Sequence, residues 1–148
     1  MHSRRQSYAA TLLGSTAEAV SRTAPCPVLI THPDEREWVD QSTGEIRLNN
    51  ILMAYDFSND SEVALMFALM LAEEYQSELH LLHVLPAKTS HTFARYDNDE
   101  FAETSRQLQE AIPEDAKLWC QLKTVVREGK PYREILEYAD EQNIDLIC

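Results

Sequence analysis

The apolar run at residues 51–55 constrains the fold of this chain more than any other feature. Its sequence, Ile-Leu-Met-Ala-Tyr, shows no alternation between polar and apolar side chains. A short continuous apolar run is typical of a parallel strand that is covered on both faces. Several helix-capping side chains follow it at once, namely Asp56, Ser58, Asn59 and Asp60. The pattern therefore predicts a strand, a loop and a helix in immediate succession.

The helix predicted after this strand is apolar on one side. Large apolar residues recur every four positions, at Val63, Phe67, Leu71 and Tyr75. Small residues stand beside them, at Ala64, Ala68 and Ala72. We interpret this pattern as an amphipathic helix whose alanines allow close packing on a sheet.

The same alternation of strand and helix continues along the chain. Further strands are predicted at residues 78–85, 118–127 and 144–147, and helices at 101–112 and after Pro131. Earlier in the chain, residues 8–23 have helical spacing, and residues 28–30 read as a buried strand. Strands that alternate with helices predict right-handed crossovers and an open parallel sheet with helices on both sides.

Composition limits the number of domains and the class of partner. With 148 residues, of which 44% are apolar, the chain is expected to form one compact domain. The 25 acidic and 13 basic residues give a net charge of -12, which would repel nucleic acids and anionic lipids. No apolar run approaches the roughly 20 residues of a membrane-spanning helix. We therefore expect a cytoplasmic protein that binds neither nucleic acid nor membrane.

Four groups of residues match motifs of one known family. They are residues 51–58, residues 78–84, residues 127–136 with 145–147, and the beginning of the chain from Leu12 to Ile30. In this combination the sequence resembles the universal stress protein (UspA-like) family over nearly the whole chain. The resemblance implies an α/β fold with an open, doubly wound, parallel five-stranded sheet of order 3-2-1-4-5. Such a sheet has helices on both faces and is adenine-nucleotide α-hydrolase-like.

The order of the family's segments is rotated in this chain. By resemblance, residues 1–32 are the closing helix and fifth strand, residues 33–50 are a linker, and residues 51–148 carry the first four strands and three helices. Two explanations fit this order. The chain is either a circularly permuted or truncated single domain, or a piece of a tandem protein that starts late in one repeat and ends early in the next.

The fifth strand can reach its place in the sheet in two ways. Within one chain, the linker must cross about 10 Å of sheet and one strand length of about 17 Å. About 20 residues reach roughly 60 Å when extended, so closure within the chain is feasible. Alternatively, the N-terminal helix and strand complete the sheet of a second molecule, because an unpaired edge strand favours augmentation. The resemblance also implies a homodimer, since family members commonly pair through the edge of the fifth strand.

The resemblance implies a nucleotide site in the crevice at the carboxyl ends of the strands. Asp56 would hydrogen-bond the adenine or the ribose, Ala54 and Val84 would line the base, and the Gly14-Ser15-Thr16 turn would meet the phosphates. The full expected set is Ala54, Tyr55, Asp56, Val84, His2, Arg4, Gly14, Ser15 and Thr16. ATP with Mg²⁺ is the cofactor that this site implies.

The phosphate loop departs from the family pattern, which reads G-x-x-G, nine residues, then G-S or G-T. Gly14-Ser15 supplies the end of that pattern, but Arg4, with nine residues between it and Gly14, stands at the place of the second glycine, and both upstream glycines are absent. Three readings therefore stay open. The first is a regulatory stress-response module that dimerises and senses a nucleotide. The second is an ATP-binding protein with slow or no hydrolysis, and the third is a structural remnant of a tandem protein.

Candidates for metal binding and catalysis are weaker. His80 and His83 form an H-x-x-H pair, but on a strand this spacing puts the two rings on opposite faces, so they cannot share a metal. We expect structural roles for both. No Ser, Cys or Thr lies in a recognisable nucleophile motif, so we assign no catalytic residue and no metal site, and we do not predict an enzyme.

Overall fold

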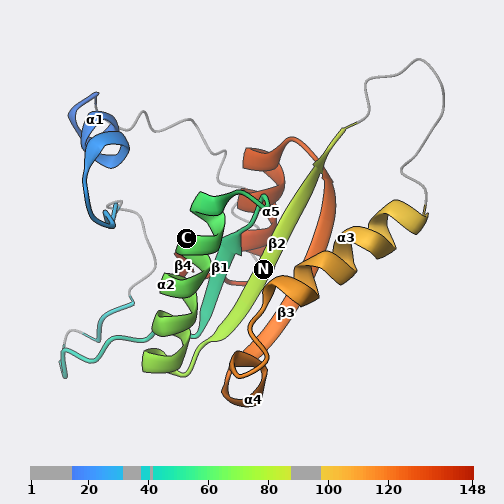
Figure 1. Cartoon of the computed structure of the whole chain (residues 1–148). Helices are drawn as coiled ribbons and strands as arrows, with labels where there is room; N and C mark the ends of the chain where they lie inside the picture. The colour runs from blue at the N-terminus through green and yellow to red at the C-terminus, as the bar shows by residue number, and fades with distance from the viewer. Residues whose placement is uncertain (1–14, 32–37, 41, 88–97) are drawn as a thin grey trace, which may run out of the picture. The chain divides into compact units, whose positions relative to one another are not determined.

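The computed structural model describes residues 15–31, 38–40, 42–87 and 98–148. The chain divides into two units, residues 1–36 and residues 37–148, which are described separately. The second unit contains the sheet and all the helices after α1 that are labelled in Figure 1. This second unit therefore determines what can be said about the fold.

A parallel four-stranded sheet forms the centre of the second unit. Its strands are β1 (Asn50–Ala54), β2 (Glu78–Pro86), β3 (Gln121–Gly129) and β4 (Leu146–Ile147). They lie in the order β3-β2-β1-β4, and β2 pairs with β3 from Glu78 opposite Gln121 to Pro86 opposite Gly129. The α/β class and the predicted order of the first four strands are confirmed.

Helices cover both faces of this sheet, as Figure 1 shows. They are α2 (Asn59–Tyr75), α3 (Asn98–Ala111), the short α4 (Ala116–Trp119) and α5 (Pro131–Glu141). Alternate residues of β1 enter two separate cores. Ile51 and Met53 pack with α2 and α3, whereas Leu52 packs with Tyr138 of α5. Both faces of the central strand are therefore buried, as its continuous apolar sequence predicts.

The buried side of α2 agrees with the prediction in part. The predicted Ala68 and Ala72 are buried, and Leu71 packs partly against the same core. Val63 and Phe67, however, are 59% and 47% exposed, and Leu65 and Leu69 are buried instead. The helix carries apolar side chains nearly all the way round, so a spacing of four residues fits more than one choice of buried side. The choice of face depends on contacts with the sheet, which the helix sequence does not contain.

The first unit contains α1 (Ser15–Thr23), which forms the described part of the helix predicted at residues 8–23. The predicted buried strand at Val28, Leu29 and Ile30 is not formed, and these residues are 39%, 61% and 44% exposed. A strand needs a neighbour to pair its backbone groups, and Pro27 also removes one donor. The described part of the chain thus has a sheet of four strands rather than the expected five.

The described part of the predicted linker has local structure. Val39 and Ile46 form an isolated antiparallel bridge across a turn. The carboxylate of Asp40 accepts hydrogen bonds from the backbone N–H groups of Ser42 at 2.9 Å and Thr43 at 3.2 Å. These bonds satisfy turn donors that would otherwise need water.

Candidate functional site

The carboxyl ends of β1, β2 and β4 lie close together at one edge of the sheet. Ala54 donates its backbone N–H to the carbonyl of Cys148 at 3.1 Å, and Tyr55 donates to the carbonyl of Leu82 at 2.9 Å. Val84 packs on the α5 side of the sheet, and strand alternation puts the side chain of Ala54 on that side too. These two small apolar side chains therefore share one face near this edge.

Asp56 follows this edge directly and organises the beginning of α2. Its Oδ1 accepts a hydrogen bond from the backbone N–H of Ser58 at 3.0 Å. Ser58 is the N-cap of α2, and its Oγ accepts from the N–H of Ser61 at 3.2 Å. Hydrogen bonds from the side chain and the backbone of Ser58 hold the pKa of Asp56 below its usual value. An exposed, ionised carboxylate therefore stands at the end of β1, where it can accept hydroxyl or amide donors.

On the α2 side of the sheet, three aromatic rings contact one another near the carboxyl end of β1. Phe57 has a positive φ of 64°, which is rare for a bulky residue, and its ring centroid lies 5.2 Å from that of Tyr55 and 4.8 Å from that of His83. His83 Nδ1 donates to the carbonyl of Tyr55 at 2.7 Å. The ring of Tyr55 is buried in the core under α2, so this expected site residue lies on the other side of the sheet from Val84.

The remaining residues of the expected site belong to the first unit. Ser15 and Thr16 are exposed residues at the beginning of α1. His2, Arg4 and Gly14 lie outside the described residues. The described structure thus puts Ala54 and Val84 on one face of the sheet, with Asp56 two residues after Ala54, and a phosphate loop stays a prediction.

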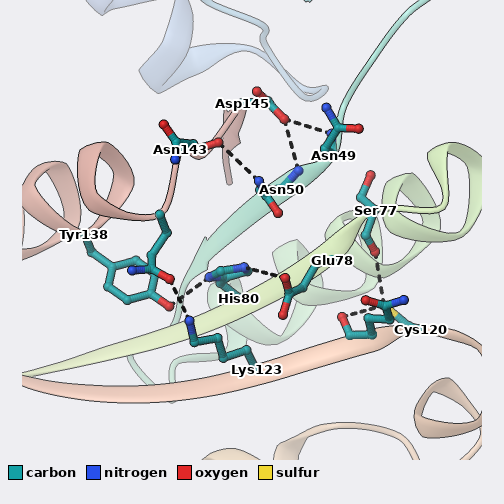
Figure 2. Close-up of polar contacts among 12 residues, drawn as sticks. Asn49, Asn50, Ser77, Glu78, His80, Cys120, Lys123, Tyr138, Asn143 and Asp145 are labelled. Carbon is teal, nitrogen blue, oxygen red and sulfur yellow. Dashed lines mark hydrogen bonds and ion pairs between the residues drawn. The ribbon is translucent and has the colours of Figure 1, made fainter.

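A second polar cluster lies nearer the beginning of β2, on the α5 side of the sheet (Figure 2). His80 is 2% exposed, and its Nδ1 shares a hydrogen bond of 2.8 Å with the hydroxyl of Tyr138. Its Nε2 lies 3.5 Å from Glu78 Oε2 but has no hydrogen-bond partner. Lys123, the neighbour of His80 on β3, donates from Nζ to Gln142 Oε1 at 2.6 Å.

Burial dominates the ionisation of this cluster. It lowers the pKa of His80 and outweighs the opposing effect of Glu78. It also raises the pKa of Tyr138 to about 12. Sequence reasoning missed this pair, because His80 and Tyr138 are 58 positions apart and no local pattern links them. The neutral ring and the hydroxyl form a structural contact away from the strand ends that hold Asp56.

The two histidines of the H-x-x-H pair point to opposite sides of the sheet, as predicted. His80 contacts Tyr138 of α5, whereas His83 contacts Tyr55 and Phe57. Within the described ranges, no three His, Cys, Asp or Glu side chains gather closely enough to hold a metal ion. In these same ranges, no helix is both long enough and apolar enough to span a membrane.

Order β3-β2-β1-β4, helices on both faces and a carboxylate at the strand ends define an open, doubly wound α/β domain. The sequence pattern of the universal stress protein family matches residues 47–148. The chain belongs to this family.

Individual relatives agree with this assignment. Universal stress protein YxiE of Bacillus subtilis (strain 168) is 33% identical, over 67% of this chain and 76% of the relative. The structure of universal stress protein UspA from Lactobacillus plantarum is 28% identical, covers 70% of this chain and 77% of its own, and has a TM-score of 0.60.

A second similar structure is a universal stress protein in complex with cAMP. It is 18% identical and covers 68% of this chain and 74% of its own, with a TM-score of 0.52. At this level of identity, the similarity shows the fold.

Proposed function

We propose that this chain is a regulatory module of the stress response that senses an adenine nucleotide at the carboxyl edge of β1. Membership of the universal stress protein family supports the stress-response role. The observation that carries the nucleotide site is Asp56, an exposed carboxylate with a lowered pKa at the end of a buried parallel strand. Ligands of open α/β sheets bind at this edge. A structural neighbour in complex with cAMP supports the same ligand class.

The site divides into a described part and an expected part. Asp56 accepts hydrogen bonds from the ribose hydroxyls or the adenine amine, and Ala54 and Val84 provide the small apolar surface beside the base. The turn at Ser15 and Thr16, together with His2, Arg4 and Gly14, is the expected phosphate-binding part, with Mg²⁺ as counterion. The alternative function is an ATP-binding protein with slow or no hydrolysis, which would use the same residues.

A homodimer with exchanged N-terminal segments is the expected assembly. β4 has only two residues in the ladder, and Ile147 at its end is 44% exposed. Residues 28–30 are exposed, apolar and unpaired. An unpaired edge and a free apolar segment are complementary, because a parallel strand contributes backbone hydrogen bonds to the edge it joins. Light scattering that gives the mass of one chain would refute this assembly.

Calorimetric titration with ATP and Mg²⁺, repeated with cAMP, tests the nucleotide site. We expect saturable heat with the unmodified chain and at least about tenfold weaker binding for Asp56→Ala, since a charged hydrogen bond contributes about 1.5–3 kcal/mol. Asp56→Asn keeps an acceptor for Ser58 and separates loss of charge from loss of the turn. Asp60→Ala, an exposed acid in the first turn of α2, is the matched control and should bind normally.

The two outcomes have different consequences. Equal weakening by Asp56→Ala and Asp60→Ala would assign the effect to general charge rather than to a contact. If a cooperatively folded chain gave no binding heat in the titration, nucleotide sensing would be refuted. A nucleotide-independent module would then remain. The family assignment would be unaffected, because it rests on the sequence match.

A further inference from the structure

One face of α2 carries large apolar residues that the described unit does not cover. Val63, Met66, Phe67 and Met70 are 59%, 53%, 47% and 63% exposed. Their spacing of i, i+3, i+4 and i+7 places them on one stripe, which we call the α2 stripe. The opposite side of the helix, with Leu65, Ala68 and Leu69, is already buried on the sheet. The α2 stripe is therefore apolar surface that the described residues of the second unit leave uncovered.

A groove of about 650 Å³ continues this surface toward α3. Val63 and Met66 line it from the α2 stripe, and Phe57, which is 37% exposed, lines it from the loop before α2. Gln107 and Glu110 line it from α3. The combination of a concave part and a row of apolar anchors fits an elongated, rod-like ligand. The two methionines can adapt their side chains to such a partner.

Acidic residues surround the α2 stripe. Asp60 and Glu62 lie in the first turn of α2, and Glu73 and Glu74 lie near its last turn. The sequence of α2 contains no lysine or arginine. Glu110 on the far side of the groove adds an acid, although Arg106 pairs with it. The apolar surface is therefore framed by negative charge at both ends.

This charge pattern decides between the possible occupants. Two copies of α2 packed against each other, parallel or antiparallel, would bring acidic ends against acidic ends, and like charges across an interface cost several kcal/mol. A basic partner gains from the same pattern, and the net charge of -12 would attract it from a distance. An amphipathic helix with a lysine- or arginine-rich polar side matches both the apolar row and the acids.

We propose that the α2 stripe, with its adjoining groove, is a docking site for a basic amphipathic helix of a partner protein. Helix recognition in grooves uses apolar anchors at i, i+3, i+4 and i+7, which is the spacing that the α2 stripe presents. This interaction surface does not depend on nucleotide binding at Asp56.

Fluorescence anisotropy with the full chain tests the docking site. The probe is a labelled helical peptide of about four turns, with leucines on one face and lysines elsewhere. One control peptide has glutamate in place of lysine, and a second has serine in place of leucine and keeps the charge. We expect saturable binding of the first peptide and at least about tenfold weaker binding of both controls, which corresponds to about 1.4 kcal/mol.

Variants of the chain locate the contact. Met66→Gln combined with Met70→Gln should weaken binding about tenfold or more, while Leu118→Gln, at an apolar residue that is 87% exposed on α4, should leave binding unchanged. Glu73→Lys combined with Glu74→Lys should weaken binding as well. Thermal unfolding of each variant checks that the fold is intact.

Four results would overturn the docking site. The first is equal binding of the serine peptide, which would mean unspecific charge attraction. The second is unchanged binding by the double methionine variant. The third is a chain that self-associates through the α2 stripe, seen as a loss of dimer mass in the methionine variant by light scattering. Absence of peptide binding to the unmodified chain would also refute it.

Discussion

Removal of the hydroxyl group of Tyr138 is expected to lower the free energy of unfolding. The expected loss is well above what the small cavity left by the hydroxyl would cost. His80 and Tyr138 are 2% and 3% exposed. The Tyr138 hydroxyl, at 2.8 Å, is the hydrogen-bond partner of His80 Nδ1. His80 Nε2 already lacks a hydrogen bond. Tyr138→Phe would therefore leave a buried imidazole with neither nitrogen satisfied.

The magnitude follows from this count of unsatisfied atoms. A buried polar group that loses its partner costs about 1–3 kcal/mol, so Tyr138→Phe should lower the free energy of unfolding by that amount. With an m-value of about 1–3 kcal/mol/M, the urea midpoint should fall by roughly 1 M. The double variant of His80→Leu and Tyr138→Phe removes both polar partners. Its cost should be smaller than the sum of the two single costs by at least about 1 kcal/mol.

Urea unfolding followed by circular dichroism at pH 8, where the imidazole is neutral, provides the measurement. Tyr132→Phe is the matched control on the same helix, because Tyr132 is 58% exposed. It should change the free energy of unfolding by less than about 0.5 kcal/mol. If Tyr138→Phe were as mild as Tyr132→Phe, or if the double variant were simply additive, the reasoning about the buried pair would be wrong.

Two further predictions concern pH and a long-range backbone contact. Burial puts the pKa of His80 below its ordinary 6.5, so the imidazole of the unfolded chain binds a proton first as the pH falls. The free energy of unfolding should therefore decrease as the pH drops below about 6.5. His80→Leu should reduce this loss, which is measured as unfolding midpoints between pH 8 and pH 5. Asp145→Ala should lower the free energy of unfolding in urea by about 1–3 kcal/mol. The reason is that Asp145 Oδ2 accepts hydrogen bonds from the N–H groups of Asn49 at 2.8 Å and Asn50 at 3.0 Å (Figure 2). Asp140→Ala, at an exposed residue, is the control and should change it little.

The sequence predicts the local order of this fold well because parallel strands covered on both faces leave a strong signal. The apolar run of β1, the capping side chains before α2 and Pro131 at the beginning of α5 each determine structure through neighbouring residues. Features that depend on distant partners were not predictable in this way. The buried side of α2 is set by the sheet, and residues 28–30 need a neighbouring strand before they can form one.

The candidate site shows the same division. The place of Asp56 was predictable, because it directly follows the apolar run of β1 and precedes the capping side chain of Ser58. Its role at a nucleotide stays a prediction that the family resemblance implies. Phe57 with its positive φ and its contact with His83 was not, since no local rule places a bulky residue in that conformation. The expected phosphate-binding part, residues 2–16, belongs to the first unit, and the nucleotide titration tests it.

The nucleotide site and the docking site meet at the beginning of α2, yet they depend on different side chains. The nucleotide site uses Asp56 in the turn before the helix, where its carboxylate accepts from the N–H of Ser58. The docking site uses exposed side chains along the helix, from Val63 to Met70, and its groove includes Phe57 of that turn. Substitution of Met66 and Met70 leaves the turn intact, so nucleotide heat should persist when peptide binding is lost. Asp56→Asn should give the opposite pattern. Loss of both activities in either variant would instead mean that α2 itself had unfolded or shifted on the sheet.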